Sequence, residues 1–317
     1  VSSQTTSTRA ANLLASFIII PVTLLIQAES AIMFLAPDAE SPNGIGALWA
    51  IIAGMCVVVV LLLRVGNSIF NREELLGRTI DQLNLKGTLR KIGRYSIAVD
   101  DGGTPARNVI DWYRRGVTLS LRHLGWAPAV TMLVFVLALI GGVVIGRLPD
   151  WQLELPRGLS LGEVVSDFDS SLGVFFGAQP VMAIVWQNGR ILLLALILGM
   201  FTFGSLALIV TPAVYVILGY LFTQVAVAGY DPSFLLPAVL THGVVEIPVI
   251  VLATAAALHL GAVITRPPRG VTVGHAWVVA LADTIKIAVG ILIPGLVAAA
   301  LIEVYVTPAV VKLVLGG

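Results

Sequence analysis

The feature that most constrains this chain is a series of apolar stretches, each about as long as a bilayer is thick. A helix needs roughly 20 apolar residues to cross the hydrocarbon core, and such stretches recur along most of the chain. Hydrophobic residues make up 57% of the sequence and charged residues 12%, with a mean hydropathy of +0.96. The stretches are continuous, without the apolar and polar alternation of a membrane β-barrel. We therefore predict an all-α, polytopic helical membrane protein.

Gly, Pro and charged residues divide the apolar stretches into about seven transmembrane helices. The first two, at about 12–35 and 47–63, form a helical hairpin, and the third covers about 127–145. The last four are expected at about 191–210, 213–228, 236–264 and 277–306. We expect the fourth helix to end at Thr211–Pro212, with a broken or re-entrant pair over 191–228 as the alternative.

The distribution of charge predicts the orientation in the membrane. Between residues 64 and 126 there are eleven Lys and Arg residues and six Asp and Glu residues, whereas acidic residues are in excess between 147 and 180. Inner loops of membrane proteins carry an excess of Lys and Arg. We therefore expect a multi-pass protein of the cell membrane with its amino terminus in the cytoplasm.

Two amphipathic helices are expected at the membrane surfaces, one on each side. The outer one covers 161–172, and the inner one covers 110–124, where apolar residues recur at helical spacing largely opposite Arg115 and Arg122. The inner helix has two interpretations. It either lies on the inner face of the membrane or is a solvated connecting helix packed on its neighbours.

The candidate site is the stretch Thr241–Pro248, which places ionisable side chains inside a transmembrane helix. His242 and Glu246 are one helical turn apart, and polar side chains at membrane depth must face protein, water or a partner. The next transmembrane helix contains Asp283 and Lys286, and it is expected to run antiparallel beside the helix that carries His242 and Glu246. We predict that Glu246 and Lys286 form a buried ion pair, flanked by His242 and Asp283.

Three uses of this polar cluster are open. The side chains can hold helices together by hydrogen bonds, they can line a path for protons or ions because burial shifts carboxylates and His toward neutral pKa values, or His242 and Glu246 can bind a metal. The metal interpretation lacks the second His and the separate acidic ligand of intramembrane metalloproteases. We expect no metal, no cofactor, no nucleic-acid partner and no enzymatic activity. No nucleotide-binding P-loop is present in the sequence, so any ATP hydrolysis requires another chain.

From about Trp126 to Pro308 the chain resembles the stage II sporulation protein M family. That family has a membrane domain of five transmembrane helices and a His-Gly-x-x-Glu motif. The matching residues here are Asn188, His242, Gly243, Glu246 and Glu303, with Gly199 and Gly204 in the fourth helix. The resemblance implies a non-enzymatic membrane component that works with cell-wall hydrolases in remodelling the envelope.

The first 85 residues resemble the carboxyl-terminal end of a type-2 ABC exporter permease. The similarity rests on the stretch Arg9–Phe17 with Pro21 inside the first helix, and on Phe70–Leu76 after the second. It implies that Val1 begins a fragment of a longer permease. The chain then divides into a permease-like hairpin (1–85), a cytoplasmic connecting segment (86–125) and a stage II sporulation protein M-like membrane domain (126–317).

These observations lead to three expected functions. The first is a membrane subunit of a transport system, acting as the permease component of a separate ATPase. The second is a scaffold that recruits proteins which remodel the cell envelope. The third is conduction of protons or ions. In all three, the lipid bilayer is the immediate partner.

Overall fold

The computed structural model describes residues 85–153 and 181–314, together with positions 23, 27, 49, 51–54, 56 and 59–60. Apart from those scattered positions, the expected hairpin of residues 12–63 lies outside the described residues, as does the expected outer helix at 161–172. The two described ranges are helical, and an isolated antiparallel bridge joins Ala98 to Pro105. The predicted all-α fold is confirmed.

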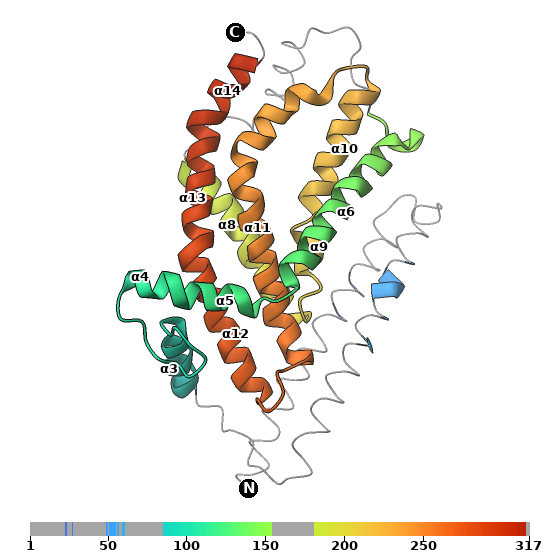
Figure 1. Cartoon of the computed structure of the whole chain (residues 1–317). Helices are drawn as coiled ribbons and strands as arrows, with labels where there is room; N and C mark the ends of the chain where they lie inside the picture. Colours follow the sequence, from blue (N-terminus) through green and yellow to red (C-terminus); the bar gives the residue numbers. More distant parts are fainter. Residues whose placement is uncertain are drawn as a thin grey trace.

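Five helices in the described residues are long and apolar enough to cross a membrane, and Figure 1 shows them as one bundle. They correspond to the third to seventh of the predicted helices. They are α6 (Ala127–Arg147), α8 (Val181–Phe201), the run Ala207–Val227 made of α9 (Ala207–Val210) and α10 (Ala213–Val227), α11 (Leu235–Thr265), and the run Val273–Val311.

The last run is one long helix interrupted by two π-helical turns. Its parts are α12 (Val273–Ile287), η5 (Ala288–Leu292), α13 (Ile293–Leu301), η6 (Ile302–Val306) and α14 (Thr307–Val314). The first π turn ends two residues before Pro294, which has no backbone N–H to donate and whose ring would clash with the carbonyl of Gly290 in a regular helix. The run covers 39 residues, so it is about 58 Å long and exceeds the thickness of the hydrocarbon core.

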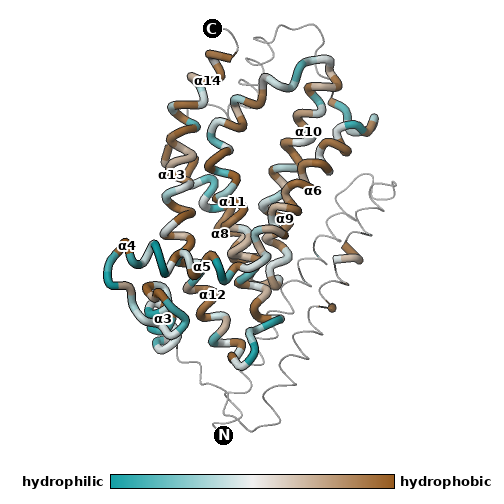
Figure 2. The backbone as a smooth tube through the Cα atoms, viewed as in Figure 1, coloured by the Kyte–Doolittle hydropathy of each residue, from teal (hydrophilic) through white to brown (hydrophobic). Residues whose placement is uncertain are grey.

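Helix α11 is the centre of the bundle and packs against α6, α8, α12 and α13 (Figure 1). In its most apolar stretch 61% of residues are buried, against 6% in α8. The outer helices expose apolar side chains, such as Leu133, Leu137 and Ile140 on α6, and Figure 2 shows brown, apolar residues along the bundle. An apolar exterior of this extent is suited to lipid rather than to water. The structure is thus that of an integral, multi-pass membrane protein.

Helices α6 and α10 touch through their backbones. A Cβ atom added at Gly142 would lie 2.0 Å from the carbonyl oxygen of Val216, and one added at Gly219 would lie 2.2 Å from that of Leu139. Such distances are far below van der Waals contact, so each position accepts only glycine at this helix separation. Small residues allow this close approach of membrane helices.

The chain reverses direction between α8 and α9, and not at Thr211–Pro212 as predicted. Phe203 and Gly204 have φ angles of 54° and 92°, in the left-handed region that ends helices. Gly204 packs closely against Gly261 of α11. A Cβ atom added at Gly261 would lie only 2.2 Å from the backbone nitrogen of Gly204. The prediction was wrong because Pro212 directly precedes α10, where a proline at the start of a helix is tolerated.

The residues before α6 form a polar segment, which we call the cap (residues 85–126). It contains α3 (Leu85–Ser96) and one helical stretch made of α4 (Val109–Asp111), the π turn η2 (Trp112–Val117) and α5 (Thr118–His123). This stretch runs across the direction of the long helices (Figure 1). In its second half, Val117 and Leu124 are buried, whereas Ile110 and Tyr113 in its first half are exposed. The apolar stripe predicted for 110–124 is therefore only partly covered by the bundle.

Candidate functional site

The four ionisable residues predicted to meet lie in two separate groups, and the expected Glu246–Lys286 ion pair does not form. Lys286 pairs with Asp283, and Glu246 contacts His242 and a residue of α8. The two helices are antiparallel, as predicted. However, Val249 of α11 lies level with Gly295, since a Cβ atom added at Gly295 would be 2.4 Å from Cγ2 of Val249. Gly295 is nine residues beyond Lys286, about 13 Å along a helix. The prediction was wrong because Glu246 and Lys286 sit at different depths.

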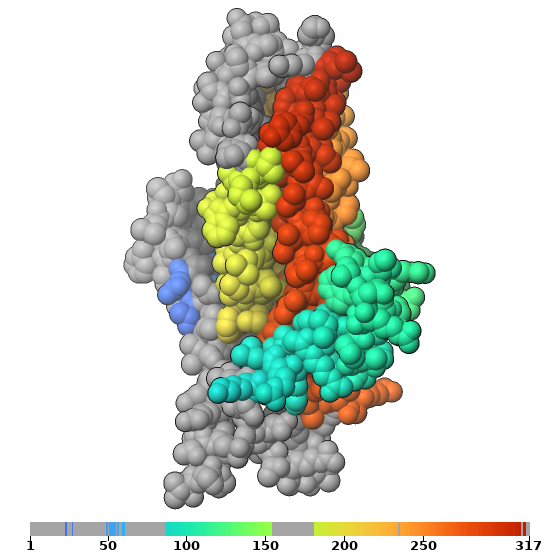
Figure 3. Space-filling view, turned by 90° about the vertical axis from the view of Figure 1, so that its left-hand side faces the viewer, coloured from blue at the N-terminus to red at the C-terminus, as the bar shows by residue number. Residues whose placement is uncertain are grey.

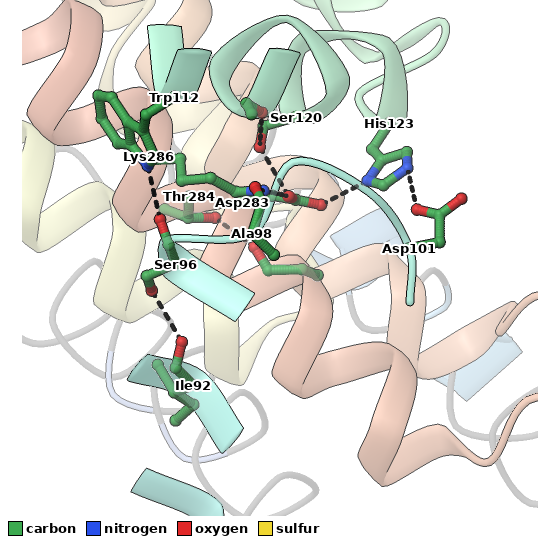
Figure 4. Close-up of polar contacts among 12 residues, drawn as sticks. Ile92, Ser96, Ala98, Asp101, Trp112, Ser120, His123, Asp283, Thr284 and Lys286 are labelled. Atoms are coloured by element: carbon green, nitrogen blue, oxygen red, sulfur yellow. Dashed lines mark hydrogen bonds and ion pairs between the residues drawn. The ribbon is translucent and has the colours of Figure 1, made fainter. Parts of the chain in front are cut away.

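The first group joins the cap to α12, and we call it the junction cluster (Ser120, His123, Asp283 and Lys286; Figure 4). Asp283 is its centre. Its Oδ1 accepts a hydrogen bond from Ser120 Oγ at 2.7 Å and lies 3.1 Å from Lys286 Nζ. Its Oδ2 lies 2.6 Å from Nδ1 of His123. One carboxylate thus binds two side chains of α5 and one of its own helix.

Further contacts extend this cluster through the cap (Figure 4). Lys286 Nζ also donates to the carbonyl of Ala98 at 3.4 Å, and Nε2 of His123 lies 3.1 Å from Oδ1 of the exposed Asp101. Both Ala98 and Asp101 belong to the loop after α3. The α3 loop and α5 are therefore held on the same two charged residues of α12.

Burial makes these contacts necessary. Asp283, Lys286 and Ser120 are buried, and a charge removed from water is tolerated only when it is paired and hydrogen-bonded. The hydrogen bond to Asp283 raises the pKa of His123 above its ordinary value, against the opposing effect of partial burial. His123 lies before α6, outside the long apolar helices, and its protonated form strengthens the link to α12.

The second group lies inside the bundle, and we call it the mid-span cluster (Asn188, His242, Glu246, Glu303 and Thr307). Asn188 Nδ2 donates to Glu246 Oε1 at 2.5 Å, and Nε2 of His242 lies 3.6 Å from Glu246 Oε2. Nδ1 of His242 lies 3.5 Å from Thr307 Oγ1. Glu303 lies in η6, four residues before Thr307 on the same helical run. These contacts link α8, α11 and the η6–α14 part of the long helix.

Asn188 lies in the first half of α8, and its side-chain amide contacts Glu246. In the described part of the chain, no three His, Cys, Asp or Glu side chains are grouped so that they could hold a metal ion.

All residues of the mid-span cluster except Thr307 are among those on which the sequence resemblance rests, and comparison with known families agrees with it. Residues 176–308 match the model of the Stage II sporulation protein M family. Neither the curated proteins nor the solved structures gave a match. The match begins before α8 and ends within α14.

This stretch is therefore similar to the Stage II sporulation protein M family. Its motif residues His242 and Glu246 face Asn188 and Thr307, and the motif glycine Gly243 is buried. The motif thus lies where three helices meet. Asp283 and Lys286 also fall inside the matched stretch, but their partners Ser120 and His123 lie before it.

Ser120 and His123 were not among the residues predicted from the sequence to form a site, although both bind Asp283. Two signals were available. Asp283 and Lys286 are three residues apart on one helix, a spacing that brings side chains together, and Ser120 and His123 have the same spacing in the cap. Nothing in either helix, however, indicated that these two pairs would meet.

Proposed function

We propose that this protein is an integral membrane subunit of a transport system, working as the permease component of a separate ATPase. The observation that carries the proposal is the junction cluster, in which Asp283 of α12 binds both Ser120 and His123 of the cap. An ATPase is a soluble subunit and acts on a permease from the membrane surface. Such a permease needs a surface segment firmly connected to a transmembrane helix.

The cap has the properties that this role requires. It carries eight Lys and Arg residues against three Asp and no Glu, and Figure 2 shows much of it in teal, the colour of hydrophilic residues. Because the cap holds both Asp283 and Lys286, a displacement of the cap must either move α12 or break buried charge contacts, which is costly. Force applied at the surface would thus reach the long helix.

We propose further that the cap lies on the cytoplasmic side, with the amino terminus on that side too. The cap and the loop containing Arg266 and Arg269 lie at one end of the bundle, whereas Asp150 and Asp231 follow the ends of α6 and α10 at the other (Figure 1). This asymmetry of charge follows the positive-inside rule. The two helices expected before residue 64 return the amino terminus to the side of the cap.

Affinity purification of the full chain from native membranes after crosslinking tests the transport proposal. We expect an ATPase to be recovered, and we expect Arg90→Glu combined with Lys91→Glu, both on the exposed face of α3, to reduce its recovery severalfold. Asp231→Asn, at the opposite end of the bundle, is the control and should leave recovery unchanged. Recovery of cell-wall hydrolases without any ATPase would contradict the proposal and favour the scaffold.

Proton or ion conduction is a second candidate function, favoured by the mid-span cluster. Its side chains place a carboxylate, an imidazole and a hydroxyl in sequence within the bundle. Such a chain of groups can accept and pass protons.

A further inference from the structure

The first turns of the α4–α5 stretch expose apolar side chains outside the long helices. Val109 and Ile110 are 70% and 69% exposed, although the same helical stripe is buried farther along, at Val117 and Leu124. We call residues 107–115 the overhang. A row of exposed apolar side chains on a helix marks an interaction site.

The overhang projects beyond the bundle beside the long helix. Figure 1 shows α4 outside the line of α12 and α13, and Figure 3, from that side, shows the cap against the lower part of the long helix and extending past it. Trp112 of the overhang contacts the long helix at Gly290. A Cβ atom added at Gly290 would lie 3.3 Å from the ring of Trp112. Nothing among the described residues covers Val109 or Ile110 at this position.

The surface next to this contact is one that lipid must cover. Val289 and Ile293 flank Gly290 on the long helix and are both exposed, within a run long and apolar enough to cross the membrane. The apolar residues of the overhang are therefore close to the lipid-facing stripe of the long helix. Both surfaces need the same apolar environment.

The charges of the overhang suit the membrane surface rather than its interior. Arg107, Arg114 and Arg115 are exposed, and Arg115 also lies 3.6 Å from the carboxylate of Asp111 one turn away. Helices with an apolar face and arginines on the polar face lie in the headgroup region, and anionic lipids attract the arginines.

We propose that the overhang is seated in the bilayer surface, with Val109, Ile110 and Tyr113 at the acyl boundary and its arginines on anionic phospholipid headgroups. The cap is then bound at two points: to α12 through the junction cluster and to the lipid through the overhang. This role is independent of an ATPase.

Spin labelling of the full chain in lipid nanodiscs tests the position of the overhang. Ile110→Cys is labelled with a nitroxide in a Cys56→Ser background, which removes the single cysteine of the chain. Leu89→Cys on α3 is the matched control, because Leu89 is apolar and 66% exposed. We expect the label at 110 to be relaxed mainly by oxygen, which dissolves in lipid, and the label at 89 mainly by a water-soluble nickel complex. Equal access of nickel to both labels would show an overhang open to a soluble partner and would overturn the proposal.

The headgroup preference is tested with the same label at 110 in two lipid compositions. Phosphatidylglycerol mixed into phosphatidylcholine should raise the ratio of oxygen to nickel accessibility severalfold over phosphatidylcholine alone. Arg107→Gln combined with Arg114→Gln should abolish that increase, whereas Arg90→Gln with Lys91→Gln on α3 should preserve it. No effect of phosphatidylglycerol, or equal loss in both double variants, would overturn the assignment to anionic headgroups.

Discussion

Lys286 Nζ lies 3.1 Å from Asp283 Oδ1, one turn away on the same helix, and both side chains are 3% exposed. A pair buried this deeply adds little net stability by itself, because each charge has lost its hydration. Both charged groups therefore need further hydrogen-bond partners. Ser120, His123 and the Ala98 carbonyl supply them from the cap, so the pair fixes where the cap docks.

Lys286→Met should strongly destabilise the protein, because it leaves the Asp283 carboxylate buried without its cation. We expect a loss of about 3–5 kcal/mol in the free energy of unfolding, measured by unfolding in detergent micelles. Adding Asp283→Asn to Lys286→Met should recover much of the loss, since the double variant buries no charge at this site. A Lys286→Met protein as stable as the parent would contradict the role assigned to the pair.

The link between His123 and Asp283 should make stability depend on pH. The hydrogen bond to Asp283 raises the pKa of His123 above the ordinary value of 6.5, so its stabilising contribution is fully present below pH 6.5. That contribution is lost as the pH rises through the raised pKa. We therefore expect the melting temperature to fall as the pH increases above 6.5.

His123→Gln should flatten this part of the pH profile, because the titrating group is gone. His275→Gln is the control, because His275 is exposed and its ring packs against the ring of Tyr95 rather than binding Asp283. It should keep the profile of the parent protein. An unchanged slope in His123→Gln would show that another group causes the pH dependence.

Gly142→Ala should separate α6 from α10, because the added methyl group would overlap the carbonyl oxygen of Val216. Overpacking of this kind typically costs about 1–3 kcal/mol, and we expect a lower melting temperature in detergent. Gly141→Ala is the matched control, because a Cβ there meets nothing within 4 Å. Equal stability of the two variants would show that the close contact is not required.

Glu246→Gln distinguishes conduction from packing in the mid-span cluster. Gln keeps an oxygen that accepts the hydrogen bond from Asn188 but cannot release a proton at neutral pH. If the cluster conducts, proton flux into liposomes driven by a pH gradient should be abolished while the melting temperature stays close to that of the parent. Unchanged flux in a folded variant would reject conduction through Glu246.

The transmembrane helices were predictable from sequence because length and apolarity are local properties. The runs that became α6, α11 and the long last helix needed no knowledge of their neighbours. The turn at Phe203 and Gly204 was harder to locate, because it interrupts an apolar run without any charged residue. Its position depends on the close contact of Gly204 with Gly261 on another helix.

The partners of the buried charges were not predictable by counting residues from the membrane surfaces. The predicted ion pair requires Glu246 and Lys286 to lie at one depth, but the packing of Val249 on Gly295 shows that the two residues are offset along their helices. The hydrogen bond from Ser120 to Asp283 joins residues 163 positions apart. The periodicity of the cap identified its apolar face and gave no information about which helix that face would contact.

The backbone contact between α6 and α10 limits how the bundle can change shape. Glycines on both helices bring main-chain atoms together at Gly142 and Gly219, and an interlocked main chain cannot repack by switching rotamers as side chains can. Sliding or rotation of one helix on the other would drive carbonyl oxygens into the facing backbone. The two helices must therefore move as one rigid body, and an opening motion would have to part this body from α11 and the long last helix.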